Sequence, residues 1–243
     1  MPLPSRVVDE FGIQWGGLVA QVEMFGRTAP QARLVTNGNL IGSVLPTVPQ
    51  SSLANAALCR DPTATPHDLE AVADEFRRAG VQKWGLWLPG ELPAPEHAMV
   101  LDSTPAAMFH DLTDLEDVPA VATPDLATVG RVNDHAYGVA EPRLAPSLAN
   151  LDPSVHAYGI GDHSVAMAYD HGHDDTVVWF VATRPEDRGK GLASRLLKRL
   201  LLEAKQRGRK SASLQASAKG KGVYERLGFR TVGTLHLYEE RFS

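Results

Sequence analysis

The stretch RPEDRGKGLASRLLKRL, residues 184–200, places two glycines in front of a leucine-rich, charged run. A glycine in a helix interior costs about 1 kcal/mol relative to alanine, so Gly189 and Gly191 indicate a position that a side chain would obstruct. The first N–H groups of a helix have no partner within the helix and lie at the positive end of its dipole, where they bind phosphate oxygens. Arg188 and Lys190 add positive charge at the same place. The pattern therefore predicts an anion-binding loop.

The segments on either side of the loop predict a strand and a helix. TVVWFVAT, residues 176–183, is mostly β-branched and aromatic, as in a strand buried on both faces. Gly208 is the expected C-cap of the helix that follows the loop. The apolar side chains of that helix recur on one face, at Leu192, Leu196, Leu197, Leu200, Leu201 and Ala204.

Three kinds of phosphate loop share this strand, loop and helix order. A P-loop requires G-x-x-x-x-G-K-[ST], which does not occur here. A dinucleotide loop requires a third glycine where Ser194 stands, and an acidic residue about 20 positions further on, which is also missing. The remaining pattern, Arg188-Gly189-Lys190-Gly191-Leu192-Ala193, resembles the Q/R-x-x-G-x-G/A pyrophosphate loop of the GNAT superfamily of N-acetyltransferases.

A second motif strengthens the resemblance. LQASAKGKGVYERLGF, residues 214–229, resembles the family's strand, polar residue and short helix that ends in Tyr-x-x-x-Gly-Phe. Ser217 stands seven residues before Tyr224, and Gly228-Phe229 close the helix. The two motifs occur in the family's order and separation, and the resemblance covers residues from about 124 to 243.

The resemblance implies an α/β fold with a mixed sheet, and acetyl-CoA as cofactor. The pyrophosphate is then expected on the loop, with the pantetheine arm paired to backbone of the preceding strand like an added strand. The cofactor-binding residues implied are Val181 and Thr183 on the strand, Arg188, Gly189, Lys190, Gly191, Leu192, Ala193 and Ser194 on the loop, and Ser217.

The resemblance also implies that Tyr224 is the catalytic acid that protonates the departing thiolate. The alternative for Tyr224 is a packing role, and Ser217 either bonds the pantetheine or caps the short helix. The general base is not identified by the sequence. Asp134, His135 and Glu141 are candidates by position alone.

Two further patterns favour a structural interpretation. HGHDD, residues 171–175, contains two histidines and two carboxylates, but no distant partner marks a metal site, so a polar turn is expected and no metal. Trp84 and Trp87 are expected in a core rather than on a binding surface.

Composition limits the class of protein. The chain has 243 residues, is 43% hydrophobic and 22% charged, and carries a net charge of −5, which argues against general nucleic-acid binding. Cys59 is the only cysteine, so neither an intrachain disulfide nor a thiolate cluster is expected. No window is apolar enough for a membrane span, and the N-terminus lacks a signal-peptide core. A cytoplasmic protein is therefore expected.

The length predicts two domains. The acidic, proline-containing segment 110–126 places the boundary near residue 120, giving a GNAT acetyltransferase domain over 121–243 and a smaller domain over 1–120. Aligning Gly80 with Gly208 suggests that residues 1–120 are a degenerate GNAT-like copy. Its helix entrance, DPTATPHDLEAV, lacks both glycines, so no cofactor is expected there.

These inferences predict an acyltransferase that moves an acetyl group from acetyl-CoA to an unidentified small-molecule or peptide amine. The alternative is a catalytically silent acyl-CoA-binding regulatory protein. No nucleic-acid or membrane partner is expected, and a homodimer is compatible with the sequence. The fold alone does not supply the acceptor.

Overall fold

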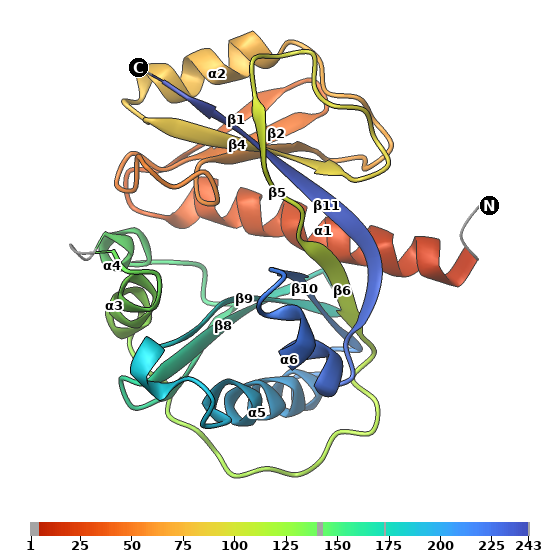
Figure 1. Ribbon diagram of the computed structural model, residues 1–243, viewed down its shortest axis with the longest axis vertical. Helices are drawn as coiled ribbons and strands as arrows, with labels where there is room; N and C mark the ends of the chain where they lie inside the picture. The colour runs from red at the N-terminus through yellow and green to blue at the C-terminus, as the bar shows by residue number, and fades with distance from the viewer. Residues whose placement is uncertain (1–4, 140–142, 173, 243) are drawn as a thin grey trace.

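The second half of the chain contains the predicted strand, loop and helix, followed by the predicted strand and short helix (Figure 1). The computed structural model describes residues 5–139, 143–172 and 174–242. The predicted elements are β9 (Asp175–Thr183), α5 (Leu192–Gln206), β10 (Ser211–Ala216) and α6 (Lys221–Arg226). The other elements of this half are α3 (Leu126–Ala136), the short helix α4 (Leu144–Ser147), β7 (Val155–Ile160), β8 (Ser164–His171), the 3₁₀ helix η1 (Pro185–Asp187) and β11 (Arg230–Arg241).

The first half contains a long helix that the sequence pattern did not predict. Helix α1 (Ser5–Thr28) contains four glycines, which lower helix propensity, so packing on both sides has to stabilise it. The predicted helix α2 is confirmed, and its apolar face, Leu69, Val72, Ala73 and Phe76, is buried. The other elements are β1 (Arg33–Asn37), β2 (Leu40–Val44), β3 (Ala56–Cys59), α2 (Leu69–Arg78), β4 (Lys83–Pro89), β5 (Val100–Ser103) and β6 (Ala106–His110).

The described strands join in one 11-stranded sheet, with the order β1-β2-β3-β4-β11-β6-β10-β9-β8-β7 and β5 paired to β11. The two halves exchange their last strands. Strand β6, from the first half, lies between β10 and β11, and the far end of β11 pairs with β4 through Leu235–Arg241. The division near residue 120 remains a prediction, and backbone pairing crosses it.

Both halves build a similar unit of strands. In each half, three successive strands pair antiparallel, as β1-β2-β3 and as β7-β8-β9. The third strand then pairs parallel with the next one, β3 with β4 and β9 with β10, through a connection that contains α2 or α5. A helix is the usual connection for parallel neighbours.

Helix α1 lies between the two halves (Figure 1). One of its faces contributes Trp15, Leu18 and Val22 to a core with strands β2, β3, β4, β6 and β11. Another contributes Met24 and Phe25 to a core with α3, α4, β8 and β9. The α5 helix packs a third core against the opposite face of the second-half sheet. Because α1 belongs to both of the first two cores, the halves share their apolar interior.

Candidate functional site

Strands β9 and β10 separate in the middle of the second-half sheet. Their parallel pairing runs from Ser211 opposite Asp175 to Leu214 opposite Val178 and then stops, although both strands continue. The register of β9 against β8 shifts at the same level, and Phe180 has a positive φ of 47°. A bulge of this kind bends a strand and re-aims its side chains. The result is a splay between the two strands, open at the end that leads into the loop after β9.

The loop after β9 presents a row of free N–H groups beside this splay. Gly189 and Gly191 have φ of 77° and 74°, a conformation that glycine adopts without cost. A Cβ atom at either residue would meet nothing within 4 Å, so the loop faces open space. Within the described residues, none of the N–H groups of residues 189–194 has a hydrogen-bond acceptor. This arrangement is an anion-binding concavity at the start of α5.

The two cations of the loop are engaged with the protein itself. The Arg188 guanidinium donates to the Ala136 carbonyl at 2.8 Å and to the Thr183 carbonyl at 3.3 Å. Lys190 Nζ donates to Asp187 at 2.7 Å. Hydrogen bonds from Lys190 and then His163 lower the pKa of Asp187. Arg188 therefore joins the loop to the end of α3, a contact that the sequence pattern did not predict.

Tyr224 lies on α6 with its ring packed edge-on to Phe229, 5.8 Å between centroids. The ring is half-buried in the α5 core, to which Val181 of β9 also belongs. Within the described part of the chain, the Tyr224 hydroxyl has no hydrogen-bond partner. Burial, with a smaller contribution from Tyr137, raises the pKa of Tyr224 well above its usual value of 10. Tyr224 thus holds its proton at any physiological pH.

Ser217 begins the turn that leads into α6. Its hydroxyl oxygen accepts a hydrogen bond from Gly220 N at 3.2 Å, and its carbonyl accepts from Gly220 and Lys221. This contact closes the turn before α6. It does not cap the helix, whose N-cap is Gly220 without a side-chain hydrogen bond, so the two alternatives for Ser217 stay predictions. The hydroxyl is exposed and its proton is available for a second bond.

Two of the three candidate bases have structural contacts. Asp134 is buried, and its carboxylate accepts from the backbone N–H of Arg143 at 2.7 Å and of Leu144 at 3.0 Å, at the start of α4. His135 is exposed and lies 3.3 Å from Glu186. Glu141 lies outside the described residues. The described candidates therefore offer no free carboxylate at the splay.

The HGHDD turn holds a hydrogen-bonded group rather than an open ligand set. His171 Nε2 lies 2.9 Å from Asp175 Oδ2, and the hydroxyls of Ser211 and Ser213 donate to the same carboxylate at 2.6 and 2.7 Å. His173 is outside the described residues. Trp84 and Trp87 are buried in the first-half cores, as predicted.

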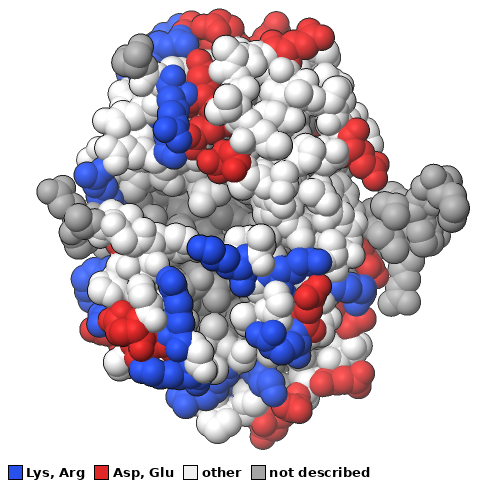
Figure 2. Space-filling model, in the orientation of Figure 1, with Lys and Arg blue, Asp and Glu red and all other residues white. Residues whose placement is uncertain are grey.

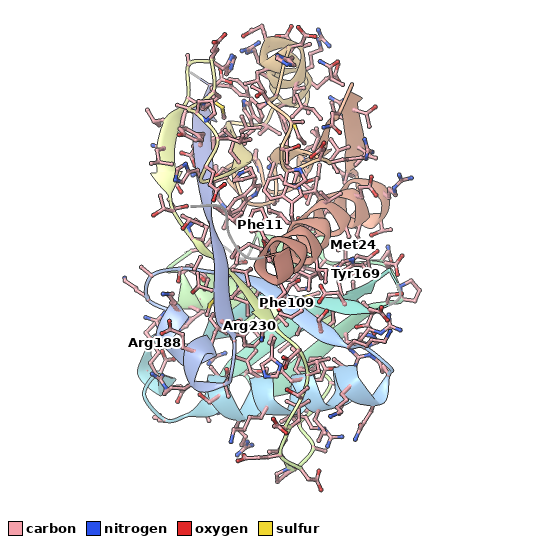
Figure 3. All side chains as sticks on the ribbon, turned by 90° about the vertical axis from the view of Figure 1, so that its right-hand side faces the viewer. Phe11, Met24, Phe109, Tyr169, Arg188 and Arg230 are labelled. Carbon is pink, nitrogen blue, oxygen red and sulfur yellow. The ribbon has the colours of Figure 1, made fainter. Side chains whose placement is uncertain are left out.

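Figure 2 shows the face on which the loop and α6 lie. This face is hollowed over α1 and again over β9 beside α6, and Lys and Arg side chains border the lower hollow. A separate pocket of about 320 Å³ lies between the end of α1 and the end of β8, lined in part by Arg27, Tyr169 and His171. Figure 3 places Arg188 and Tyr169 at opposite sides of the second half. That pocket is therefore distinct from the splay.

Comparisons with known proteins agree with this geometry. Residues 154–231 match the family model of the acetyltransferase (GNAT) domain. A GCN5-related N-acetyltransferase from Kribbella flavida superimposes with a TM-score of 0.65 at 19% identity, over 96% of this chain and 97% of that one. An acetyltransferase assigned to the GNAT family from Novosphingobium aromaticivorans gives 0.60 at 19% identity, over 98% and 99%. No curated protein sequence matches the chain.

A third structural relative, a conserved protein of unknown function from Staphylococcus epidermidis, has a TM-score of 0.61 at 12% identity, over 88% of this chain and 95% of that one. Identities this low establish the fold, and the shared fold spans both halves. Because residues 154–231 match the acetyltransferase family model, the chain carries a domain of the acyltransferase class. Residues 154–231, which contain the splay, the loop and all of α6, are a GNAT acetyltransferase domain. Within the described residues, no helix has the length and apolar character of a membrane span.

Proposed function

We propose that the protein transfers an acetyl group from acetyl-CoA to a primary amine. The observation that carries the proposal is the row of unpaired N–H groups at residues 189–194, which adjoins the splay between β9 and β10. A pyrophosphate fits the first feature and an extended pantetheine arm fits the second. Val181 has no register partner in β8 at the bulge, and we propose that its backbone pairs with that arm.

Each proposed residue then has a defined task. Gly189 through Ser194 bind phosphate oxygens with backbone N–H groups, and their dipoles favour the negative charge. Arg188 has to exchange its contact with the Thr183 carbonyl for a phosphate, which frees that carbonyl to accept from the pantetheine. Ser217 donates its hydroxyl proton to the same arm.

Tyr224 is the proposed acid. Bound acetyl-CoA supplies an activated acetyl group on a sulfur atom, and Tyr224 holds the proton that the departing sulfur needs. Proton transfer from an ordinary tyrosine to an ordinary thiolate is uphill by roughly 2 kcal/mol, which is small beside a typical catalytic barrier. Burial makes the tyrosine a weaker acid. The same low-dielectric surroundings make a thiolate more basic, so donation at the sulfur remains feasible.

We also propose that residues 1–120 are a degenerate copy of the GNAT-like half and form one wall of the acceptor site. The strand arrangement common to both halves supports the degenerate copy. The wall of the acceptor site is supported by the packing of Phe25 on Trp179, whose ring centroids are 4.7 Å apart. Acceptor sites commonly lie where two substructures meet.

Calorimetry with acetyl-CoA and a thiol-release assay over a panel of primary amines test the proposal together. We expect one cofactor per chain and thiol release that depends on an amine. Two cofactors per chain would contradict the assignment of a single loop. Cofactor binding without thiol release for any amine would favour the alternative, a catalytically silent acyl-CoA-binding regulatory protein. The observation that favours this alternative is that the described candidate bases offer no free carboxylate at the splay.

A further inference from the structure

Buried polar side chains without partners gather at the splay, on the face that α1 covers. Among the described residues, Trp179 Nε1 and Gln215 Nε2 are covered and have no hydrogen-bond partner. Trp179 is the first residue of β9 beyond the pairing with β10, and Gln215 is the first of β10 beyond it. Two N–H donors therefore flank the point where the strands separate.

Helix α1 packs on the face of β9 and β10 that carries these two donors. Side chains alternate along a strand, so Val177 and Trp179 share one face, as do Ser213 and Gln215. Gly17 of α1 lies against that face, since a Cβ on it would come within 2.9 Å of Ser213 Oγ and 3.3 Å of Val177 Cβ.

The next turn of α1 brings Gln21 over the same face. Gln21 is one helical turn beyond Gly17, and one turn further Phe25 contacts the ring of Trp179. The Gln21 Oε1 atom is buried and unpaired within the described chain, as are both amide atoms of Gln14, one turn before Gly17.

Such groups require a partner from outside the chain. A buried donor or acceptor without a hydrogen bond destabilises the fold, so native proteins retain few of them. Two N–H donors and one carbonyl acceptor are complementary to an amide, which offers a C=O and an N–H. Gln21, Trp179 and Gln215 carry no charge, so they do not favour a charged group over a neutral one.

We propose that the acceptor is a primary amine with a neighbouring amide, and that Gln215, Trp179 and Gln21 bind this amide. The inference rests on the proposed acetyl transfer. Gln215 is partly exposed, and rotation about its terminal torsion, which is broad, turns its amide toward an entering acceptor.

The low pKa of the proposed acceptor's amine agrees with a splay at which the described candidate bases offer no free carboxylate. An α-amino group has a pKa of about 7.7 to 8.0, against about 10.4 for a lysine-type amine, so at pH 7 about one tenth of it is neutral rather than about one part in 2,500. An α-amino amide reaches its nucleophilic form without a strong base.

Three acceptors of similar shape test the proposal by thiol release. Leucinamide offers both the C=O and the N–H, leucine methyl ester offers the C=O alone, and isoamylamine offers neither. We expect leucinamide to have the highest kcat/KM. Gln21→Leu should lower kcat/KM for leucinamide to the value for the ester. Gln215→Leu and Trp179→Phe should each lower kcat/KM for both substrates. The expected factor is roughly tenfold, through KM, for each hydrogen bond lost. Leucyl-glycinamide, run beside leucinamide, distinguishes a peptide N-terminus from a small amide.

A binding measurement and a melting curve separate recognition from folding. Calorimetry of leucinamide into the CoA-loaded protein should show a roughly tenfold weaker Kd for Gln215→Leu. Gln21→Leu should melt at the same or a higher temperature, because it removes a buried unpaired atom, whereas a structural role for Gln21 would lower the Tm. Gln206→Leu, which removes an exposed amide at the end of α5, is the matched control and should change neither.

Equal use of leucinamide and the ester, or an unchanged leucinamide-to-ester ratio in Gln21→Leu, would overturn the amide site and leave the proposed acetyl transfer intact. Wild-type protein that binds acetyl-CoA but releases no thiol with any amine would overturn both.

Discussion

The ends of β3 and β9 hold equivalent positions in the two halves, but their surroundings differ. At the end of β3, the Cys59 carbonyl accepts a hydrogen bond from Trp15 Nε1 at 3.0 Å, and the Trp15 ring is buried. At the end of β9, the Thr183 carbonyl accepts a longer hydrogen bond, 3.3 Å, from Arg188 Nε of the loop that follows. Strands β3 and β4 also separate, because their pairing stops at Ala57 opposite Leu86. This first-half splay has the Trp15 indole bonded at the end of β3, while we propose that the second-half splay receives the pantetheine.

The loops that follow these two strands also differ, in their ability to bind an anion. The loop after β9 has glycines at 189 and 191 and six free N–H groups. The loop after β3 contains Pro62 and Pro66, which have no N–H to offer, and Asp68 at the start of α2, where its charge opposes an anion. A shared strand arrangement thus does not confer a shared site, because the site depends on a few loop residues and on what fills the splay.

The largest effect is expected from removing the first half. A chain of residues 121–243 loses β6 from between β10 and β11, and it loses the α1 side of the core that holds Trp179. The net stability of a typical domain is only about 5–15 kcal/mol, and the fragment loses a central strand and one side of a core, so it should not fold cooperatively. Circular dichroism during thermal unfolding would show this. A fragment with a sharp transition and full-length stability would mean that the halves are independent.

Gly191→Asp should weaken acetyl-CoA binding on the order of 100-fold. The substitution places a negative charge among N–H groups proposed to bind phosphates, at a φ that strains most side chains. Gly38→Asp in the β1-β2 turn is the matched control, because Gly38 also has a positive φ and open space around it. Calorimetry should show unchanged affinity for Gly38→Asp, and an equal loss in both variants would point to general strain instead.

Tyr224→Phe should lower kcat about 100-fold and leave cofactor affinity nearly unchanged. Burial raises the pKa of Tyr224, so the proton it donates persists above the usual tyrosine value of about 10. In wild-type protein, alkaline loss of kcat through this group is therefore expected only above about pH 10. Tyr169→Phe, in the separate pocket, should retain activity. Equal turnover of Tyr224→Phe and wild type would make Tyr224 a packing residue.

The sequence predicted those parts that depend on local patterns. Periodic apolar residues and glycine caps located β9, α5, β10 and α6 to within a residue or two. Helix α1 was missed because its glycines weaken the helical pattern, and Gly17 is explained only by the strand that approaches it. The exchange of β6 and β11 was also missed, since partner choice between distant strands leaves no local signal. The proposed roles of Gln21 and Gln215 likewise depend on long-range contacts.

The smallest effect is expected from replacing a tryptophan by phenylalanine at the splay of each half. The comparison tests directly whether the two splays differ through the bonded indole of the first half. Trp15→Phe removes the donor to the Cys59 carbonyl and leaves a buried acceptor unpaired, so the free energy of unfolding should fall by about 2 kcal/mol. Trp179→Phe removes the same volume from a core, but the indole N–H that it removes has no partner among the described residues, so it lacks the cost of an unpaired acceptor and should destabilise less than Trp15→Phe. Urea unfolding of both variants gives the comparison. Because the loop after β3 has no glycine and has Asp68 at the start of α2, Trp15→Phe should not add a second acetyl-CoA site. Equal destabilisation of the two variants, or a second cofactor bound by Trp15→Phe, would show that the indole does not distinguish the two splays.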